Sequence, residues 1–179
     1  PIDPYYLSWK LKTLDYDARF IKLAGEINTQ MPKHVVDLVS ASLNESQKSI
    51  NGSKILIIGV AYKKNIDDCR ESPALDIIQI LKDSGSEIEY YDPFVPSIII
   101  GELKLNSLEI LNKSSLNKFD ATVIVTDHSQ IDYKLIKLYS KSIIDTRNVY
   151  NSYKSNKIRR LGQGSVSYTH LRAHETRHD

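Results

Sequence analysis

The stretch Ile57–Ile77, IIGVAYKKNIDDCRESPALDI, decides which fold this chain can adopt. It runs from an apolar strand through a charged loop into an apolar helix. Ser72 is placed to cap that helix, and Pro73 suits its first position, where a missing N–H costs nothing. Units of this kind often hold phosphate at the start of the helix. The stretch has no G-x-G-x-x-G, however, so it is a poor primary site for a dinucleotide.

Outward from this stretch, strands and helices alternate. We expect strands at 54–60, 87–92, 121–127 and 141–146, helices at 73–83 and 132–140, and a less regular span at 94–118 with a short strand near 103–108. Buried apolar strands in this order predict a doubly wound parallel α/β sheet. Ligands of such sheets lie beyond the carboxyl ends of the strands. The loops 61–72, 126–129 and 146–150 should therefore converge.

The first fifty residues have a different pattern. Phe20, Leu23, Ala24 and Ile27 follow helical spacing, and Pro32 suits the first turn of a second helix. We expect either a helical hairpin or one long helix kinked at this proline. The turn signal Asn51-Gly52 marks the expected domain boundary.

Composition narrows the class of protein. The chain has 179 residues, of which 41% are hydrophobic and 26% charged, with a net charge of +2. This near-neutral balance gives no reason to expect nucleic acid or membrane as a partner, and no apolar run approaches the roughly 20 residues that span a bilayer. Cys69 is the single cysteine, which fits a reducing cytoplasm. Because the sequence starts at Pro1 without Met, we expect a fragment or a processed piece.

The charged loop allows two interpretations. It carries three cations and three acids: Lys63, Lys64, Arg70, Asp67, Asp68 and Glu71. With the following helix N-terminus, the cations could hold an anion such as pyrophosphate, and Tyr62 could stack on a ring. On composition alone, a solvated loop in which acids pair with cations is the better interpretation.

Two further strand ends carry polar side chains. Arg147 follows the last strand, where its planar fork could grip a phosphate or carboxylate. Pattern alone favours a surface ion pair instead, with Asp145 as the partner. Asp127 and His128 follow the third strand; for His128 we expect a structural or solvated role rather than acid–base catalysis.

The remaining candidates carry less chemistry. Asp3, between two prolines, has a common turn composition, and Cys69 beside Arg70 is interpreted as a passive thiol. The tail contains His170, His174 and His178. This spacing would align three imidazoles on a helix, but the segment is a poor helix candidate. We expect an unstructured tail and no metal site.

Several motifs together resemble a known family. GVAYKKNIDDCRESPALDI (59–77), VIVTDHS (123–129) and IIDTRNVY (143–150), in that order, are similar to the UDP-glucose/GDP-mannose dehydrogenase family. The opening PIDPYYL and the later INTQMP look most like the branch that acts on UDP-N-acetylhexosamines. The resemblance covers residues 1–150.

The resemblance implies an arrangement of domains. Residues 1–50 would end a central helical dimerisation region, and 51–160 would form the C-terminal UDP-sugar-binding domain, which is Rossmann-like. Residues 161–179 depart from the family and resemble a translated adapter sequence, so we expect a non-native tail. A homodimer formed through 1–50 is also implied.

The activity that the resemblance implies is oxidation of the C6 hydroxyl of UDP-N-acetylglucosamine to the uronate. Two hydrides would pass to NAD, by way of a cysteine thioester. UDP-N-acetylmannosamine or UDP-glucose are alternative substrates. The catalytic cysteine would precede Pro1 and is not replaced by Cys69, and the NAD-binding domain is missing, so we expect the fragment to be inactive alone. A nucleotide-binding module without catalysis remains the other alternative.

The resemblance also assigns roles to individual residues. Asp3 matches a catalytic carboxylate that helps to activate water or the thiol. Tyr62 and Lys63 match an aromatic–lysine pair that contacts the UDP-sugar, and Arg147 matches an arginine that grips the substrate. Arg70 matches an arginine that reaches NAD.

Overall fold

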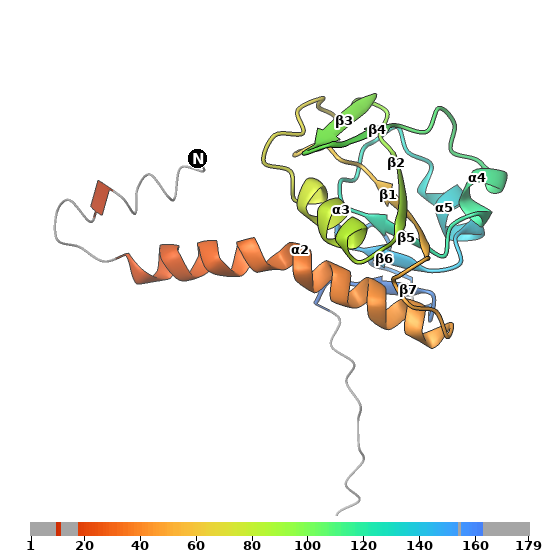
Figure 1. The fold of residues 1–179 in the computed structure, drawn as a ribbon, viewed down its shortest axis with the longest axis horizontal. Helices are drawn as coiled ribbons and strands as arrows, with labels where there is room; N and C mark the ends of the chain where they lie inside the picture. The colour runs from red at the N-terminus through yellow and green to blue at the C-terminus, as the bar shows by residue number, and fades with distance from the viewer. Residues whose placement is uncertain (1–9, 12–17, 154, 163–179) are drawn as a thin grey trace, which may run out of the picture.

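A five-stranded parallel sheet organises the part of the chain that the computed structural model describes, residues 10–11, 18–153 and 155–162. The strands lie in the order β2-β1-β5-β6-β7 (Figure 1). Their bounds are β1 Lys54–Ile58, β2 Glu87–Tyr91, β5 Ala121–Ile124, β6 Ile143–Asp145 and β7 Ile158–Arg160. Every neighbouring pair is parallel. This confirms the doubly wound, Rossmann-like α/β sheet.

The two faces of the sheet bury different residues because side chains alternate along a strand. Ile55 and Ile57 of β1 face a core shared with helices α2 (Arg19–Glu45) and α3 (Pro73–Asp83). Leu56 and Ile58 face a second core shared with α4 (Lys113–Asn117) and α5 (Tyr133–Tyr139). Both cores are continuous across the central strands, so β1 is buried on both faces, as its unbroken apolar run indicated.

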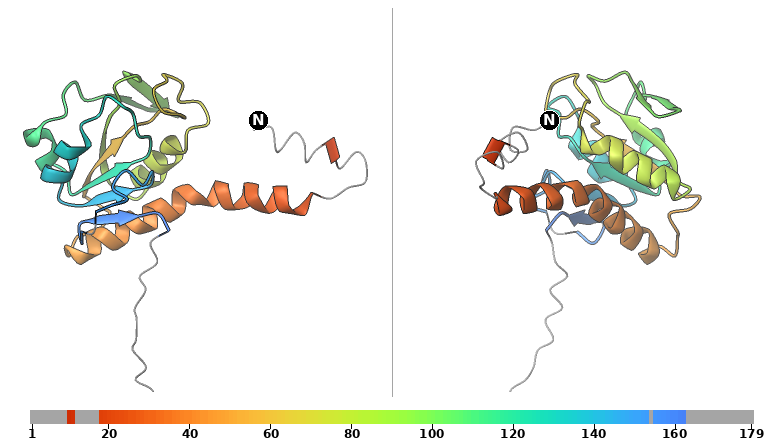
Figure 2. Two further views of the ribbon diagram at one scale, coloured as in Figure 1. Left: turned by 180° about the vertical axis from the view of Figure 1, so that it is seen from behind. Right: turned by 60° about the vertical axis from the view of Figure 1, so that its left-hand side comes forward.

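Helix α2 is one continuous helix, which excludes the hairpin expected as one alternative for this segment. Pro32 lies within it, at the start of the half whose apolar face packs against the domain. The first half projects beyond the sheet (Figures 1 and 2). Its apolar residues Phe20, Leu23 and Ile27 are 83%, 53% and 52% exposed.

Helix α3 begins as its sequence predicts. The Ser72 side chain accepts a hydrogen bond from the backbone N–H of Ala74, and Pro73 occupies the first turn. After the helix, Gly85 adopts a φ of +86°, which a residue with a side chain rarely does. The prediction of this helix and of its ends is confirmed.

Two elements escaped the sequence prediction. Strand β3 (Ser97–Ile100) pairs antiparallel with β4 (Leu103–Asn106), so the strand expected near 103–108 has a partner that the sequence did not reveal. Strand β7 adds a fifth strand to the main sheet. It has three residues, two of them arginines, and such a short polar segment carries no strand signal.

Among the described residues, no helix combines the length and the apolar character that crossing a membrane requires.

Candidate functional site

The order of the strands reverses between β1 and β5. From β1 the chain continues to β2 on one side, whereas β5, β6 and β7 follow on the other side. The carboxyl ends of β1, β5 and β6 therefore border the crevice where doubly wound sheets bind ligands. Hydrogen bonds and ion pairs join the loops 61–72, 126–129 and 146–150 there. The expected convergence of these loops is confirmed.

Gly59 makes the close approach of the first two loops possible. Its φ is +78°, and a Cβ at this position would clash with the backbone carbonyl of Thr126. The Thr126 hydroxyl donates a 2.6 Å hydrogen bond to the Ala61 carbonyl oxygen. The glycine therefore lets the β1 loop pass directly over the end of β5.

Asp127 bridges two cations from different loops. Its Oδ2 lies 3.3 Å from Nζ of Lys64, and its Oδ1 lies 3.3 Å from Nε of Arg147. Partial burial works against ionisation, but the hydrogen bonds from Lys64 and Arg147 outweigh it and hold the pKa of Asp127 below the usual carboxyl value. The carboxylate therefore stays charged and fixes both cations at the edge of the sheet.

Asp145 is not the partner of the Arg147 side chain, so the ion pair expected from the sequence is corrected. The Asp145 carboxylate is buried and accepts hydrogen bonds from the backbone N–H groups of Arg147, Val149 and Tyr150, at 3.1, 3.1 and 2.9 Å. These hydrogen bonds fix the backbone of the loop 146–150 that follows β6. The guanidinium of Arg147 pairs with Asp127 instead and remains partly exposed.

His128 is buried and has a structural role, which was one of the two roles expected from the sequence. Its side chain is 0% exposed, with Nδ1 2.9 Å from the backbone N–H of Asn65 and Nε2 3.0 Å from Oδ2 of Asp92. Burial raises the pKa of Asp92, but hydrogen bonds from His128 and from the backbone N–H groups of Phe94 and Val60 outweigh it and lower the pKa. The histidine is thus committed to protein contacts.

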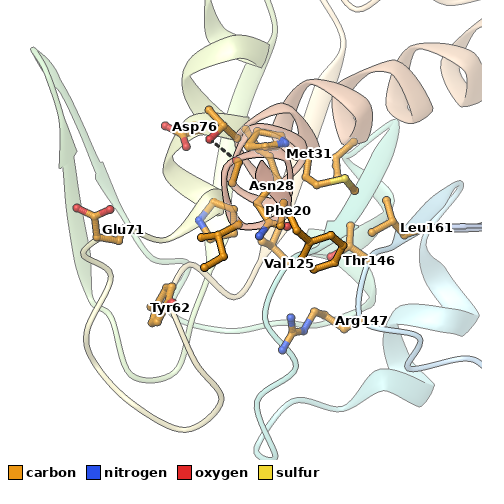
Figure 3. Close-up of a pocket in the computed structure, with 18 residues that line it drawn as sticks. Phe20, Asn28, Met31, Tyr62, Glu71, Asp76, Val125, Thr146, Arg147 and Leu161 are labelled. Atoms are coloured by element: carbon orange, nitrogen blue, oxygen red, sulfur yellow. Dashed lines mark hydrogen bonds between the residues drawn. The ribbon is translucent and has the colours of Figure 1, made fainter. Parts of the chain in front are cut away.

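A groove of about 800 Å³ lies between α2, the start of α3 and the loops 61–72 and 146–150 (Figure 3). Its wall is lined by Phe20, Ile21, Ala24, Gly25, Asn28, Thr29, Met31, Pro32, Val35, Tyr62, Glu71, Pro73, Asp76, Ile77, Val125, Thr146, Arg147 and Leu161. In the view of Figure 3, Tyr62 and Arg147 lie along one margin and Asp76 at the opposite one. The groove thus combines apolar walls with one cation and a few polar groups, the usual character of a ligand site.

Of the five predicted site residues, two line this groove, two do not, and one lies outside the described residues. Tyr62, 39% exposed, and Arg147 contribute to its wall. Lys63 is exposed, with Nζ 5.4 Å from the centroid of the Tyr62 ring, and it is not among the lining residues. Asp3 lies outside the described residues, as do His170, His174 and His178.

Arg70 is not among the residues that line the groove. Its side chain is 86% exposed and bonds Asp68 through Nε and a terminal nitrogen, at 2.9 and 2.8 Å. These hydrogen bonds lower the pKa of Asp68 to about 2. This part of the loop follows the solvated interpretation, whereas Lys64 takes its partner, Asp127, from another loop.

Sequence reasoning missed the contribution of α2. Asn28 and Thr29 bring polar groups to the groove, although their segment was assigned only to dimerisation. A signal was present, because both are weak helix formers in a helical pattern. Glu71 and Asp76 were also missed as wall residues. Cys69 packs against the core, which fits a passive thiol.

Within the part of the chain that the structure describes, no group of three or more His, Cys, Asp or Glu side chains is arranged to hold a metal ion. The groove offers cofactors and substrates a different chemistry. Arg147 can pair with an anion, and the Tyr62 ring can stack on a planar group. Asn28 can exchange hydrogen bonds with hydroxyl groups, while the Thr29 hydroxyl, which donates to the Gly25 carbonyl oxygen, can accept one.

Residues 56–152 match the model of the UDP-glucose/GDP-mannose dehydrogenase family, UDP binding domain. A UDP-N-acetyl-D-mannosamine dehydrogenase of Methanococcus vannielii is 34% identical over 92% of this chain and 38% of its own length. The UDP-glucose 6-dehydrogenase of Bacillus subtilis is 31% identical over 84% of this chain and 33% of its own.

Among solved structures, a UDP-D-ManNAc dehydrogenase from Pyrococcus horikoshii aligns with a TM-score of 0.74 and 30% identity. That alignment covers 93% of this chain and 38% of the archaeal one. The present chain therefore spans between 33% and 38% of the length of these relatives.

Proposed function

Because the chain belongs to the UDP-glucose/GDP-mannose dehydrogenase family, we propose that it supplies the UDP-sugar-binding part of an NAD-dependent nucleotide-sugar 6-dehydrogenase. In this proposal residues 51–160 hold the nucleotide and residues 1–50 end the central helical region. The parent enzyme oxidises the C6 hydroxyl of the sugar to a carboxylate. The catalytic cysteine and the main NAD site belong to the missing part, so the fragment alone has no activity.

One observation carries the proposal: Tyr62 and Arg147, from two different loops, line the same groove, beside the point where the strand order reverses between β1 and β5. A uridine ring needs a flat partner and a diphosphate needs a cation, and these side chains provide one of each. Lys63, whose ammonium lies near the Tyr62 ring, is proposed to reach the ligand from the rim. Asp3 keeps its proposed catalytic role.

The nature of the sugar follows the relatives rather than our first expectation. The sequence favoured UDP-N-acetylglucosamine, with UDP-N-acetylmannosamine as an alternative. The names of the Methanococcus and Pyrococcus relatives support the mannosamine alternative, and we adopt it. The Bacillus relative keeps UDP-glucose as a second candidate.

The residues of this chain offer few contacts for NAD. The sequence lacks the glycine fingerprint of a dinucleotide site, and Arg70 is engaged with Asp68. If Arg70 reaches the cofactor in the whole enzyme, it must exchange this partner. We propose that the missing domain supplies the rest of the NAD site and that the cofactor accepts both hydrides there.

The exposed apolar stripe of α2 supports a proposed homodimer through residues 1–50. Phe20, Leu23 and Ile27 follow helical spacing and expose most of their side-chain surface. Such a stripe on a soluble domain commonly marks an interaction surface.

The proposal is tested by titrating the chain with UDP and by assaying the parent enzyme, with the upstream half recovered from its locus. NADH release is followed with limiting UDP-ManNAc, UDP-GlcNAc and UDP-glucose in separate reactions. Two NADH per UDP-ManNAc is the expected result. Turnover of another sugar alone would keep the reaction and change the substrate. UDP binding without NADH from any sugar would support the binding module without catalysis instead.

A further inference from the structure

A buried pair of side chains, Asp92 and His128, binds the backbone N–H groups on either side of the segment Tyr62–Lys64. On one side, Oδ2 of Asp92 accepts a 3.1 Å hydrogen bond from the N–H of Ala61. On the other side, Nδ1 of His128 accepts a 2.9 Å hydrogen bond from the N–H of Asn65. The two side chains also bond each other, with Nε2 of His128 3.0 Å from Oδ2 of Asp92. The pair therefore brackets the segment that carries Tyr62.

These contacts fix the tautomer of His128. A backbone N–H can only donate, so Nδ1 must present a lone pair to Asn65. The single ring proton is then on Nε2 and points at the Asp92 carboxylate. The ring is further held by the Phe94 ring, 5.0 Å between centroids, while the Tyr133 hydroxyl donates to the His128 carbonyl oxygen. Each nitrogen of the ring thus has a separate task.

The Asn65 end of the bracket is reinforced by its own side chain. Asn65 has a φ of +60°, and its amide donates to Oγ of Ser129 at 3.0 Å and accepts from the N–H of Ser129 at 2.9 Å. A non-glycine residue with positive φ needs such support from its surroundings. The bond to His128 is therefore one of three that Asn65 makes to the 126–129 loop.

From these contacts we propose that His128 is a positioning residue, whose Nδ1 lone pair holds the Tyr62–Lys64 segment in the geometry that presents Tyr62 to the nucleotide. The nucleotide part of this inference rests on the proposed function. Because Nδ1 accepts from Asn65 while Nε2 faces Asp92, the two contacts can be removed separately.

Two substitutions in the 179-residue chain separate the two tasks. His128→Gln places its amide near the position of Nε2, so it keeps a donor for Asp92 and loses the acceptor for Asn65. His128→Asn places its amide near Nδ1, so it keeps that acceptor and loses the donor. We expect the Asn65 amide to exchange with solvent about tenfold faster in His128→Gln than in His128→Asn, the effect of one lost buried hydrogen bond.

The affinity for UDP, measured by calorimetry with UDP alone, should follow the same order and fall several-fold in His128→Gln. The exchange rate of Ile57, in the core of β1, serves as a control for global unfolding. Nitrogen chemical shifts of the wild-type imidazole report the tautomer without any substitution. A proton on Nδ1, or equal exchange at Asn65 in the two variants, would overturn the positioning role.

The two proposals can fail separately. If the wild-type chain does not bind UDP, the nucleotide-binding function fails in this chain, and so does the link between His128 and nucleotide. The tautomer and the exchange at Asn65 still decide whether His128 holds the loop. If UDP binds with equal affinity to the wild type and to His128→Gln, the binding function stands and the positioning role is overturned.

Discussion

Arg147 and Asp127 follow adjacent strands of the sheet, and Nε of the arginine lies 3.3 Å from Oδ1 of the aspartate. The carboxylate thereby holds the guanidinium at the margin of the groove that Tyr62 also lines. A cation fixed in advance loses less conformational freedom when an anion binds.

Arg147→Ala is expected to weaken UDP binding by the chain about tenfold or more, because a charge-assisted hydrogen bond contributes about 1.5–3 kcal/mol. Titration calorimetry measures the change. Lys104→Ala, which removes an exposed cation on β4, is the matched control and should leave the affinity unchanged. Equal affinities for the wild type and Arg147→Ala would remove the arginine from the site.

Tyr62→Phe should bind UDP as the wild type does, whereas Tyr62→Ala should lose about fivefold in affinity, because stacking depends on the ring and not on the hydroxyl. Lys63→Ala should weaken binding less than Arg147→Ala, since Lys63 lies outside the groove wall. The same titration measures the Tyr62 and Lys63 variants. A larger loss in Tyr62→Phe than in Lys63→Ala would show that the hydroxyl group binds the ligand.

Gly59→Ala and Gly52→Ala form a matched pair for stability. The two glycines have φ values of +78° and +79°, so backbone strain is equal, at about 1–2 kcal/mol. Gly52 has open space where a Cβ would lie, whereas at Gly59 a Cβ would meet the Thr126 carbonyl. Urea unfolding should therefore show a clearly larger loss of stability for Gly59→Ala. Equal losses would mean that the two loops separate without cost.

Asp92→Asn should destabilise the chain at neutral pH by about 1.5–3 kcal/mol, since one of the two carboxylate oxygens that accept hydrogen bonds from buried donors becomes an NH2 group. The pKa of Asp92 is lower in the folded chain than the ordinary 3.8. Its stabilising effect is therefore complete above the ordinary value and is lost as the pH falls through the folded one. Urea unfolding at neutral pH and near pH 3 checks this. The gap between wild type and variant should narrow in acid, and a constant gap would contradict the assignment.

The sequence predicted those features that depend on local chemistry. The cap at Ser72, the buried β1 run and the meeting of the three loops follow from residue types and from the rules of parallel sheets. The partner of Arg147 did not follow, because Asp145 is 2 positions away in the chain and Asp127 is 20, so nearness in sequence favoured the wrong acid. Only the three-dimensional arrangement selects Asp127. Asn28 and Thr29 stand out as weak helix formers in a helical pattern, but only the fold shows that the first half of α2 forms a wall of the groove.

Helix α2 couples the packed domain to the width of the groove. Its second half is packed on the sheet from Pro32 onward, while its first half extends past the domain as one wall of the groove. From Pro32 to Phe20 the arm measures about 18 Å, so a tilt of ~5° displaces its far end by about 1.5 Å. No loop separates the arm from the packed half. Bending of α2 therefore changes the width of the groove directly. Any domain joined to the first half of the helix can change that width by moving the helix.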